Sequence, residues 1–198
     1  MDRENARLLR QKILNRAIET IYDEGVESIT MRALARKLGY SPATIYLYFE
    51  NKQDLITAIA LHGFGLLAER TRPAIDIEDP AEAVQESARR YVEFGMEHGA
   101  LYRLMFREFS PATYPEHGRQ RIDQVWEIYR KIFQRGIECG EFRNMDPDIA
   151  ISMLWSACHG FVELALSERM PPRAVSAVRS LEALREALLE DRIHALRA

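Results

Sequence analysis

Apolar residues recur every three to four positions along most of the chain, the spacing that one face of an amphipathic helix requires. In the first segment one such row contains Leu9, Ile13, Ala17 and Ile21, and a second apolar row runs beside it. No alternating, strand-like run bounded by turn residues persists anywhere in the sequence. The pattern therefore predicts an all-α protein.

Capping residues delimit the predicted helices. Ser41, Asp79 and Asp146 each precede a proline, which is favoured at the first helical position, and Thr30 precedes another helical run. Asn51 and Asp54 have the spacing of a capping box. Together with glycines placed to end helices, these signals predict helices over residues 6–24, 30–37, 41–47, 51–71, 80–98, 100–109, 116–139, 146–168 and 173–195.

The composition is that of a folded protein. The chain has 198 residues, of which 47% are apolar and 29% charged, enough to bury a core and too apolar for a disordered chain. Only two cysteines occur, so no disulfide framework is expected and a cytoplasmic location is favoured. No run of 18 uninterrupted apolar residues and no amino-terminal apolar segment occurs, so neither a membrane partner nor a secretory signal is expected.

The charge is unevenly distributed. The whole chain has a net charge of -3, which by itself disfavours a nucleic-acid partner. Residues 1–60, however, contain nine Lys or Arg and eight Asp or Glu, and five of these cations gather between Arg3 and Arg16. Local charge therefore leaves nucleic acid open as a partner of the amino-terminal segment.

Residues 30–49 indicate a helix-turn-helix. Two short helices flank a turn at Gly39 and Tyr40, and the small Ala35 allows the helices to approach closely. The second helix would enter a major groove with short side chains, where Thr44 could read a base and Ser41 could meet a phosphate. The alternative is a tight corner in a helical bundle. Tyr46 and the aromatic residues after it, beside hydroxyl groups on a short helix, favour the helix-turn-helix.

These residues resemble the DNA-binding domain of the TetR/AcrR transcriptional regulators. The resemblance covers about the first quarter of the chain and is carried by Gly39, Ser41 and the run TIYLYFENKQDLI, which ends near Leu55. It implies a three-helix DNA-binding domain over 1–52, joined by a long helix to a ligand-binding and dimerisation bundle within 53–198. The residues expected at double-stranded operator DNA are Thr30, Arg32, Ser41, Pro42, Ala43, Thr44, Tyr46, Tyr48 and Lys52.

The carboxy-terminal segment WSACHG resembles a class of TetR-family domain marked by Trp, His and Gly, here Trp155, His159 and Gly160. Trp155 and His159 share one helix face, and packing in the bundle core is favoured over ligand contact. Some bulky residues of the second domain could nevertheless line a cavity for a small apolar or aromatic effector. This candidate ligand set is Phe64, Tyr91, Phe94, Met105, Phe109, Trp126, Tyr129, Phe133, Trp155 and His159.

A homodimer is expected because the helix over 146–168 is apolar on more than one side, so that a partner copy could cover the second side. The last predicted helix offers a further apolar stripe. The candidate interface residues are Met153, Gly160, Leu164, Val178, Leu181, Leu184 and Leu188.

Catalytic interpretations find little support. Cys158 and His159 are adjacent, so their side chains diverge on a helix, and His159 with Glu163 supplies only two metal ligands at helical spacing. No phosphate-binding loop or nucleophile motif occurs. We therefore expect no enzyme activity, cofactor or metal, and a ligand-responsive repressor rather than a helical protein-interaction adaptor without DNA affinity.

Overall fold

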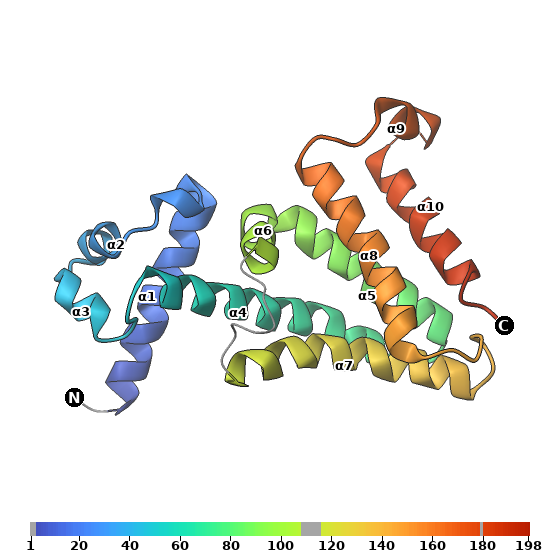
Figure 1. The fold of residues 1–198 in the computed structure, drawn as a ribbon, viewed down its shortest axis with the longest axis horizontal. Coiled ribbons are helices and arrows are strands. Elements are labelled where there is room, and N and C mark those ends of the chain that lie inside the picture. The colour runs from blue at the N-terminus through green and yellow to red at the C-terminus, as the bar shows by residue number, and fades with distance from the viewer. Residues whose placement is uncertain (1–2, 108–115, 179) are drawn as a thin grey trace. The chain divides into compact units, whose positions relative to one another are not determined.

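The computed structural model describes residues 3–107, 116–178 and 180–198, apart from the side chains at 116–117 and 177–178. Within these residues the chain is helical and contains no strand, which confirms the all-α prediction. The elements are α1 (Arg3–Glu24), η1 (Val26–Ser28), α2 (Met31–Leu38), α3 (Pro42–Tyr46), α4 (Lys52–Thr71), η2 (Arg72–Asp76), α5 (Pro80–Glu97), α6 (Gly99–Arg107), α7 (Glu116–Glu138), α8 (Pro147–Leu166), α9 (Pro172–Val178) and α10 (Leu181–His194). Figure 1 labels the α-helices among them.

The chain forms two compact units. The described residues of 1–64 and 100–119 make the first, and those of 65–99 and 120–198 make the second. Helix α4 begins in the first unit and ends in the second, so it is one of the covalent links between them.

The capping signals in the sequence set the helix starts. The Thr30 hydroxyl accepts a 3.1 Å hydrogen bond from the Ala33 amide at the start of α2. Asp79 and Asp146 cap α5 and α8 in the same way, and each is followed by a proline. Gly39 ends α2 with a left-handed φ of 74°, and the Tyr40 amide after it donates to the Ala35 carbonyl at 2.9 Å. A residue with a Cβ would be strained at Gly39.

The core of the first unit is built from α1, α2, α3 and the first half of α4. Its fully buried side chains include Ile13, Ile21, Ala35, Ile45 and Phe49. Lys37 of α2 adds a polar link to α1, because its ammonium group pairs with Glu24 and donates to the Thr20 hydroxyl. This lysine is therefore occupied within the fold.

In the second unit, α5 packs against α8, α10 and η2, and α10 also contacts α8 and α9. Buried side chains such as Val84, Val92, Leu154 and Val162 fill these contacts. By length and composition alone α8 could cross a membrane, but core helices of soluble proteins often have the same length and composition. Its packing against α5 and α10 is that of a bundle helix.

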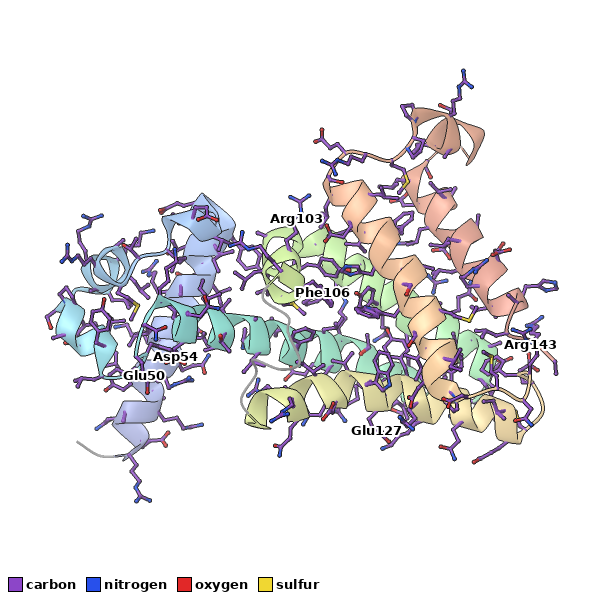
Figure 2. The ribbon with its side chains drawn as sticks, in the orientation of Figure 1. Glu50, Asp54, Arg103, Phe106, Glu127 and Arg143 are labelled. Carbon is purple, nitrogen blue, oxygen red and sulfur yellow. The ribbon has the colours of Figure 1, made fainter. Side chains whose placement is uncertain are left out.

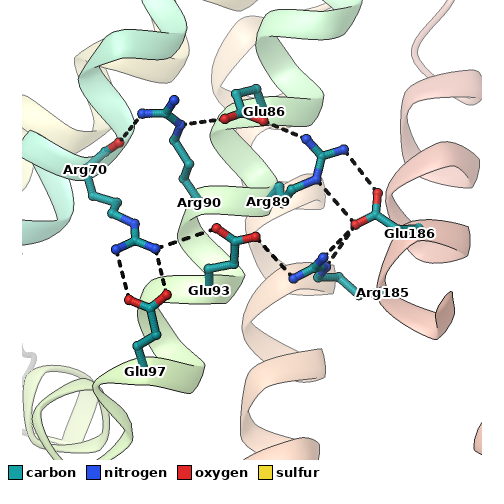
Figure 3. Close-up of polar contacts among 8 residues, drawn as sticks. All are labelled: Arg70, Glu86, Arg89, Arg90, Glu93, Glu97, Arg185 and Glu186. Atoms are coloured by element: carbon teal, nitrogen blue, oxygen red, sulfur yellow. Dashed lines mark hydrogen bonds and ion pairs between the residues drawn. The ribbon is translucent and has the colours of Figure 1, made fainter. Parts of the chain in front are cut away.

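Alternating charges connect three helices of the second unit (Figure 3). The Arg70 guanidinium lies 2.8 and 2.9 Å from the two Glu97 carboxylate oxygens and 3.6 Å from Glu93. The remaining ion pairs lie within α5, within α10 and between these two helices. This ion-pair network consists of Arg70, Glu86, Arg89, Arg90, Glu93, Glu97, Arg185 and Glu186.

The prediction of one helix over 173–195 is wrong, because the structure has two helices in this segment, α9 and α10. Ser180 has an extended backbone (φ -158°, ψ 161°), and its hydroxyl accepts a hydrogen bond from the Ala183 amide at 3.0 Å. The serine therefore starts a new helix, as an N-cap does.

Candidate functional site

Helix α3 is a five-residue helix fixed at both ends. The Ser41 hydroxyl accepts a 3.2 Å hydrogen bond from the Thr44 amide, and Pro42 occupies the first helical position. On the inner side, Ile45 and the following Phe49 are fully buried. These anchors determine which side chains of α3 point outward.

The outward face of α3 consists of Pro42, Ala43, Tyr46 and Leu47, all of which are exposed. Their spacing places them on one side of a helix, opposite Ile45. Thr44 and Tyr48 are half-buried at the flank of this face. The outward face contains no charged side chain and combines apolar surface with a phenol.

The predicted base reader Thr44 already has a local partner. Its hydroxyl lies 3.0 Å from the Ser41 hydroxyl, and either group can donate. Because each hydroxyl has one proton and two lone pairs, this pair leaves hydrogen-bonding capacity on both oxygens. Thr44 and Ser41 can therefore act together at a base edge or a phosphate.

The start of α4 carries the predicted phosphate contact Lys52, which is exposed. Asn51 accepts a 2.9 Å hydrogen bond from the Asp54 amide, and Asp54 accepts one of 3.0 Å from the Glu50 amide. Figure 2 labels Glu50 and Asp54 at this turn. Asp54 is thus used in capping, as the sequence predicts, although its hydrogen bond goes to the residue before Asn51.

The remaining two predicted DNA contacts lie at the start of α2. Thr30 is exposed and caps the helix through its hydroxyl, while Arg32 is exposed in the first turn.

Three residues near α3 were missing from the predicted DNA contacts. Leu47 is 77% exposed. From α1, the guanidinium of Arg10 lies 4.7 Å from the centre of the Phe49 ring, and the Lys12 ammonium lies 5.5 Å from that of Tyr40. The cationic cluster in the sequence pointed to Arg10 and Lys12, but only the fold brings Lys12 beside Tyr40, before α3, and Arg10 beside Phe49, after it.

Seven of the candidate ligand residues belong to the second unit, and three of them form a hydrogen-bonded group. The Trp155 indole donates to the Tyr91 hydroxyl at 2.9 Å, and this hydroxyl lies 3.3 Å from Nδ1 of His159. Trp126 meets Trp155 edge to face, with ring centres 6.3 Å apart. Tyr129 donates instead to the Ser87 carbonyl at 3.1 Å.

The other candidate ligand residues do not lie together. Phe94 and Phe133 are buried in the second unit, where they contact His98 and Phe142 respectively. Phe64 and Met105 belong to the first unit, which consists of the described residues of 1–64 and 100–119. Phe109 lies outside the described residues.

Burial controls the titration of the adjacent Cys158 and His159. Desolvation lowers the pKa of His159, and the nearby Glu163 carboxylate opposes this shift. Burial raises the pKa of the Cys158 thiol to about 12, so the thiol stays protonated and is a poor nucleophile. Among the side chains that the structure describes, no group of three His, Cys, Asp or Glu residues is arranged to hold a metal ion.

Helix α8 exposes an apolar row on the side away from α5. Ile149, Met153 and Leu164 are 56%, 47% and 42% exposed, and a Cβ added at Gly160 would have no atom within 4 Å. Ile151, Cys158 and Val162 on the other side are buried. Leu181, Leu184 and Leu188 of α10 are half-buried, and the Val178 side chain lies outside the described residues.

Known proteins share both parts of this architecture. Residues 13–59 match the model of the bacterial regulatory proteins of the tetR family, and residues 84–191 match that of the tetracyclin repressor-like C-terminal domain. The fatty acid metabolism regulator protein of Bacillus subtilis is 25% identical over 155 residues, which cover 73% of this chain and 76% of that protein.

Two solved structures share the fold. A protein of unknown function from Rhodococcus sp. RHA1 has a TM-score of 0.82 at 22% identity, with 96% of each chain covered. RolR in complex with resorcinol has a TM-score of 0.69 at 16% identity, with 98% of this chain and 90% of that chain covered.

A capped helix-turn-helix followed by a helical carboxy-terminal region is the architecture typical of helix-turn-helix transcriptional regulators. Because the two family matches account for both regions, the chain belongs to the TetR family of transcriptional regulators. The resemblance drawn from the α3 residues is thereby confirmed.

Proposed function

We propose that this protein is a ligand-responsive repressor that binds a palindromic operator as a homodimer in the cytoplasm. The observation that carries the proposal is the outward face of α3. Residues 39–48 contain no acidic side chain, and Arg10 and Lys12 lie beside the aromatic rings at either end of this segment. Such a face is compatible with the base edges of a major groove and with the phosphates on either side of it.

Each predicted DNA contact has a proposed role. Thr44 reads a base, with Ala43 and Pro42 short enough to let the helix backbone approach the base edges. Tyr46, Tyr48 and Lys52 hold phosphates, and Ser41, Thr30 and Arg32 complete the backbone contacts. In this arrangement the phosphate contacts set the position of α3, and the base contacts supply sequence preference.

The exposed apolar row of α8 supports the homodimer. A partner copy would cover Met153, Gly160 and Leu164, and the leucines of α10 would pack beside them in a four-helix, two-fold interface. The two copies of α3 would then meet successive major grooves, about 34–36 Å apart. Val178 remains part of the proposed interface.

The hydrogen-bonded group of Tyr91, Trp155 and His159, with Trp126 beside it, supports a small apolar or aromatic effector. These rings offer stacking surface together with a few polar atoms, the usual composition of a small-molecule site. RolR, which shares the fold, binds resorcinol. We place the effector beside Tyr91, Trp126, Trp155 and His159 in the second unit, and assign the protein no catalytic role or cofactor.

Helix α4 is the proposed route from effector to DNA. An effector changes operator affinity only by binding two arrangements of the dimer unequally. Gly63 lets α6 approach α4, since a Cβ there would lie 2.5 Å from Sδ of Met105. Because glycine has a low helix propensity, we expect α4 to bend at the segment that contains Gly63 and Gly65.

The decisive experiment uses DNA from the protein's own genome. Purified protein is mixed with sheared genomic fragments, bound fragments are recovered and sequenced, and the enriched region is footprinted. We expect a two-fold symmetric footprint, with the DNA flanking the protein's own gene among the enriched fragments. Recovery of no fragment above the level of an unrelated acidic protein would contradict the proposal.

A further inference from the structure

Leu47 is the large apolar side chain that the first unit leaves most exposed among its described residues, at 77%. Its backbone is helical (φ -69°, ψ -19°) and its amide donates to the last turn of α3, so it continues the register of that helix. It therefore lies one turn beyond Ala43 on the outward face. Ile45, two positions earlier, is fully buried on the opposite side of the helix. Because Leu47 points away from that side, it contributes little to the core.

The surroundings of Leu47 indicate what covers it. Tyr40 and Tyr46, also exposed, are near neighbours in the sequence, and residues 39–48 contain no acidic side chain. The cations of Arg10 and Lys12 lie at both ends of this segment. A surface with an exposed apolar side chain and cations on both sides is complementary to a polyanion that carries an apolar group near its phosphates.

Duplex DNA has one such group in its major groove, the 5-methyl of thymine. Thr44 could also contact a methyl, but it is half-buried and its hydroxyl is paired with Ser41. Leu47 projects further and has no polar atom to satisfy.

We propose that Leu47 is a specificity-determining residue whose side chain packs on a thymine methyl in each half-site of the operator. The proposal rests on the proposed function, since it requires that α3 enter the major groove. Leu47 then selects thymine over cytosine and over uracil by apolar contact alone, with no hydrogen bond.

The test removes the methyl and the leucine separately and together. A duplex is selected by the intact protein from a random-sequence pool, and each thymine is replaced in turn by deoxyuridine, which lacks only the methyl. Binding is measured for the wild type, Leu47→Ala, Leu47→Met and the control Leu8→Ala, which truncates another exposed leucine of the first unit.

We expect one position per half-site at which uracil weakens wild-type binding about fourfold, the effect of losing one buried methyl group. Leu47→Ala should bind the thymine duplex less tightly and lose this sensitivity, while Leu47→Met and Leu8→Ala should retain it. Thermal melting of the free protein should be the same for Leu47→Ala and the wild type.

Three results would overturn the inference, and only the last of them also overturns the proposed function. Wild-type binding that is indifferent to uracil at every position, or an equal uracil effect in Leu47→Ala, would remove the role of Leu47 and leave DNA binding intact. Failure of the wild type to select any duplex would overturn the proposed function and the inference together.

Discussion

Trp155 and Tyr91 are joined by a hydrogen bond of 2.9 Å from the indole nitrogen to the phenol oxygen. Because the oxygen accepts this bond, its own proton is available for Nδ1 of His159, 3.3 Å away. A neutral His159 with its proton on Nε2 can accept a hydrogen bond from that hydroxyl, whereas a charged His159 would present a second donor to the same oxygen. The group therefore favours neutral histidine.

Acidification should destabilise the protein through His159. Its pKa is lowered in the folded state by desolvation, so below about pH 6.5 the unfolded chain binds a proton that the folded chain resists. The free energy of unfolding should then fall as the pH drops from 6.5 through the lower pKa of the folded state. Urea titrations at pH 7.5 and 5.5 measure this, and His159→Gln should show a smaller loss than the wild type.

His194→Gln, which changes an exposed histidine of α10, is the matched control and should behave as the wild type. An equal loss in His159→Gln and the wild type would show that His159 does not cause the pH dependence.

The ion-pair network should stabilise the second unit cooperatively. Hydrogen bonds from Arg89, together with those from Arg185, lower the pKa of Glu186, and Arg90 and Arg89 lower that of Glu86 against the opposing effect of burial. The stabilisation is therefore present above the unfolded glutamate pKa of about 4.3 and is lost as the pH falls through the lower folded values.

Glu186→Gln should cost at most about 1 kcal/mol, and less in high salt, because the network is only partly buried. A double-mutant cycle of Glu186→Gln with Arg89→Met measures the coupling. The pair Glu4–Arg7, exposed on α1, is the control. Coupling no larger than in that pair would mean that the network is a set of independent surface contacts.

Gly136 should not tolerate a side chain. A Cβ at this position of α7 would lie 2.2 Å from the Phe142 ring, which is buried and packs on Phe133. Gly136→Ala should therefore lower the free energy of unfolding by about 1–3 kcal/mol despite the better helix propensity of alanine. Gly136→Ala with Phe142→Leu should recover part of the loss, and an unchanged midpoint in the single variant would refute the packing.

The proposed dimer can be tested by placing a charge in the exposed row of α8. The wild type should sediment as a dimer at micromolar concentration, and Met153→Glu should sediment as a folded monomer because an unpaired carboxylate would be buried in the interface. Met96→Glu, at an exposed methionine of α5, is the control and should remain dimeric. A monomeric wild type, or a dimeric Met153→Glu, would overturn the assignment of this face.

Local signals made the fold predictable up to α8. Caps such as Thr30 and Asp79 act through atoms within three residues, so a sequence pattern is enough to find them. Ser180 carries the same chemistry, but the apolar residues on both sides of it continue a helical spacing, and periodicity alone joined α9 to α10. The helix break depends on an extended backbone that the pattern does not contain.

The candidate functional side chains were less predictable where tertiary contacts decide their position. Leu47 continues an apolar run, and only the buried anchors Ile45 and Phe49 show that it points outward. Phe64 and Met105 are equally bulky whichever unit they pack in, so composition could not separate them from the residues around Trp155. These assignments require contacts between segments far apart in the sequence.

We infer that α3 and the start of α4 bind duplex DNA through the major groove and its phosphates. The most direct measurement is the salt dependence of binding to the selected duplex, compared between the wild type and Lys52→Ala. Each phosphate contact contributes a slope of about -0.9 in log K against log salt. Lys52→Ala should therefore flatten the slope by about one unit per half-site, while Arg173→Ala, at an exposed position of α9, should leave it unchanged. Equal slopes in the wild type and Lys52→Ala, or binding of the wild type that is insensitive to salt, would contradict the account.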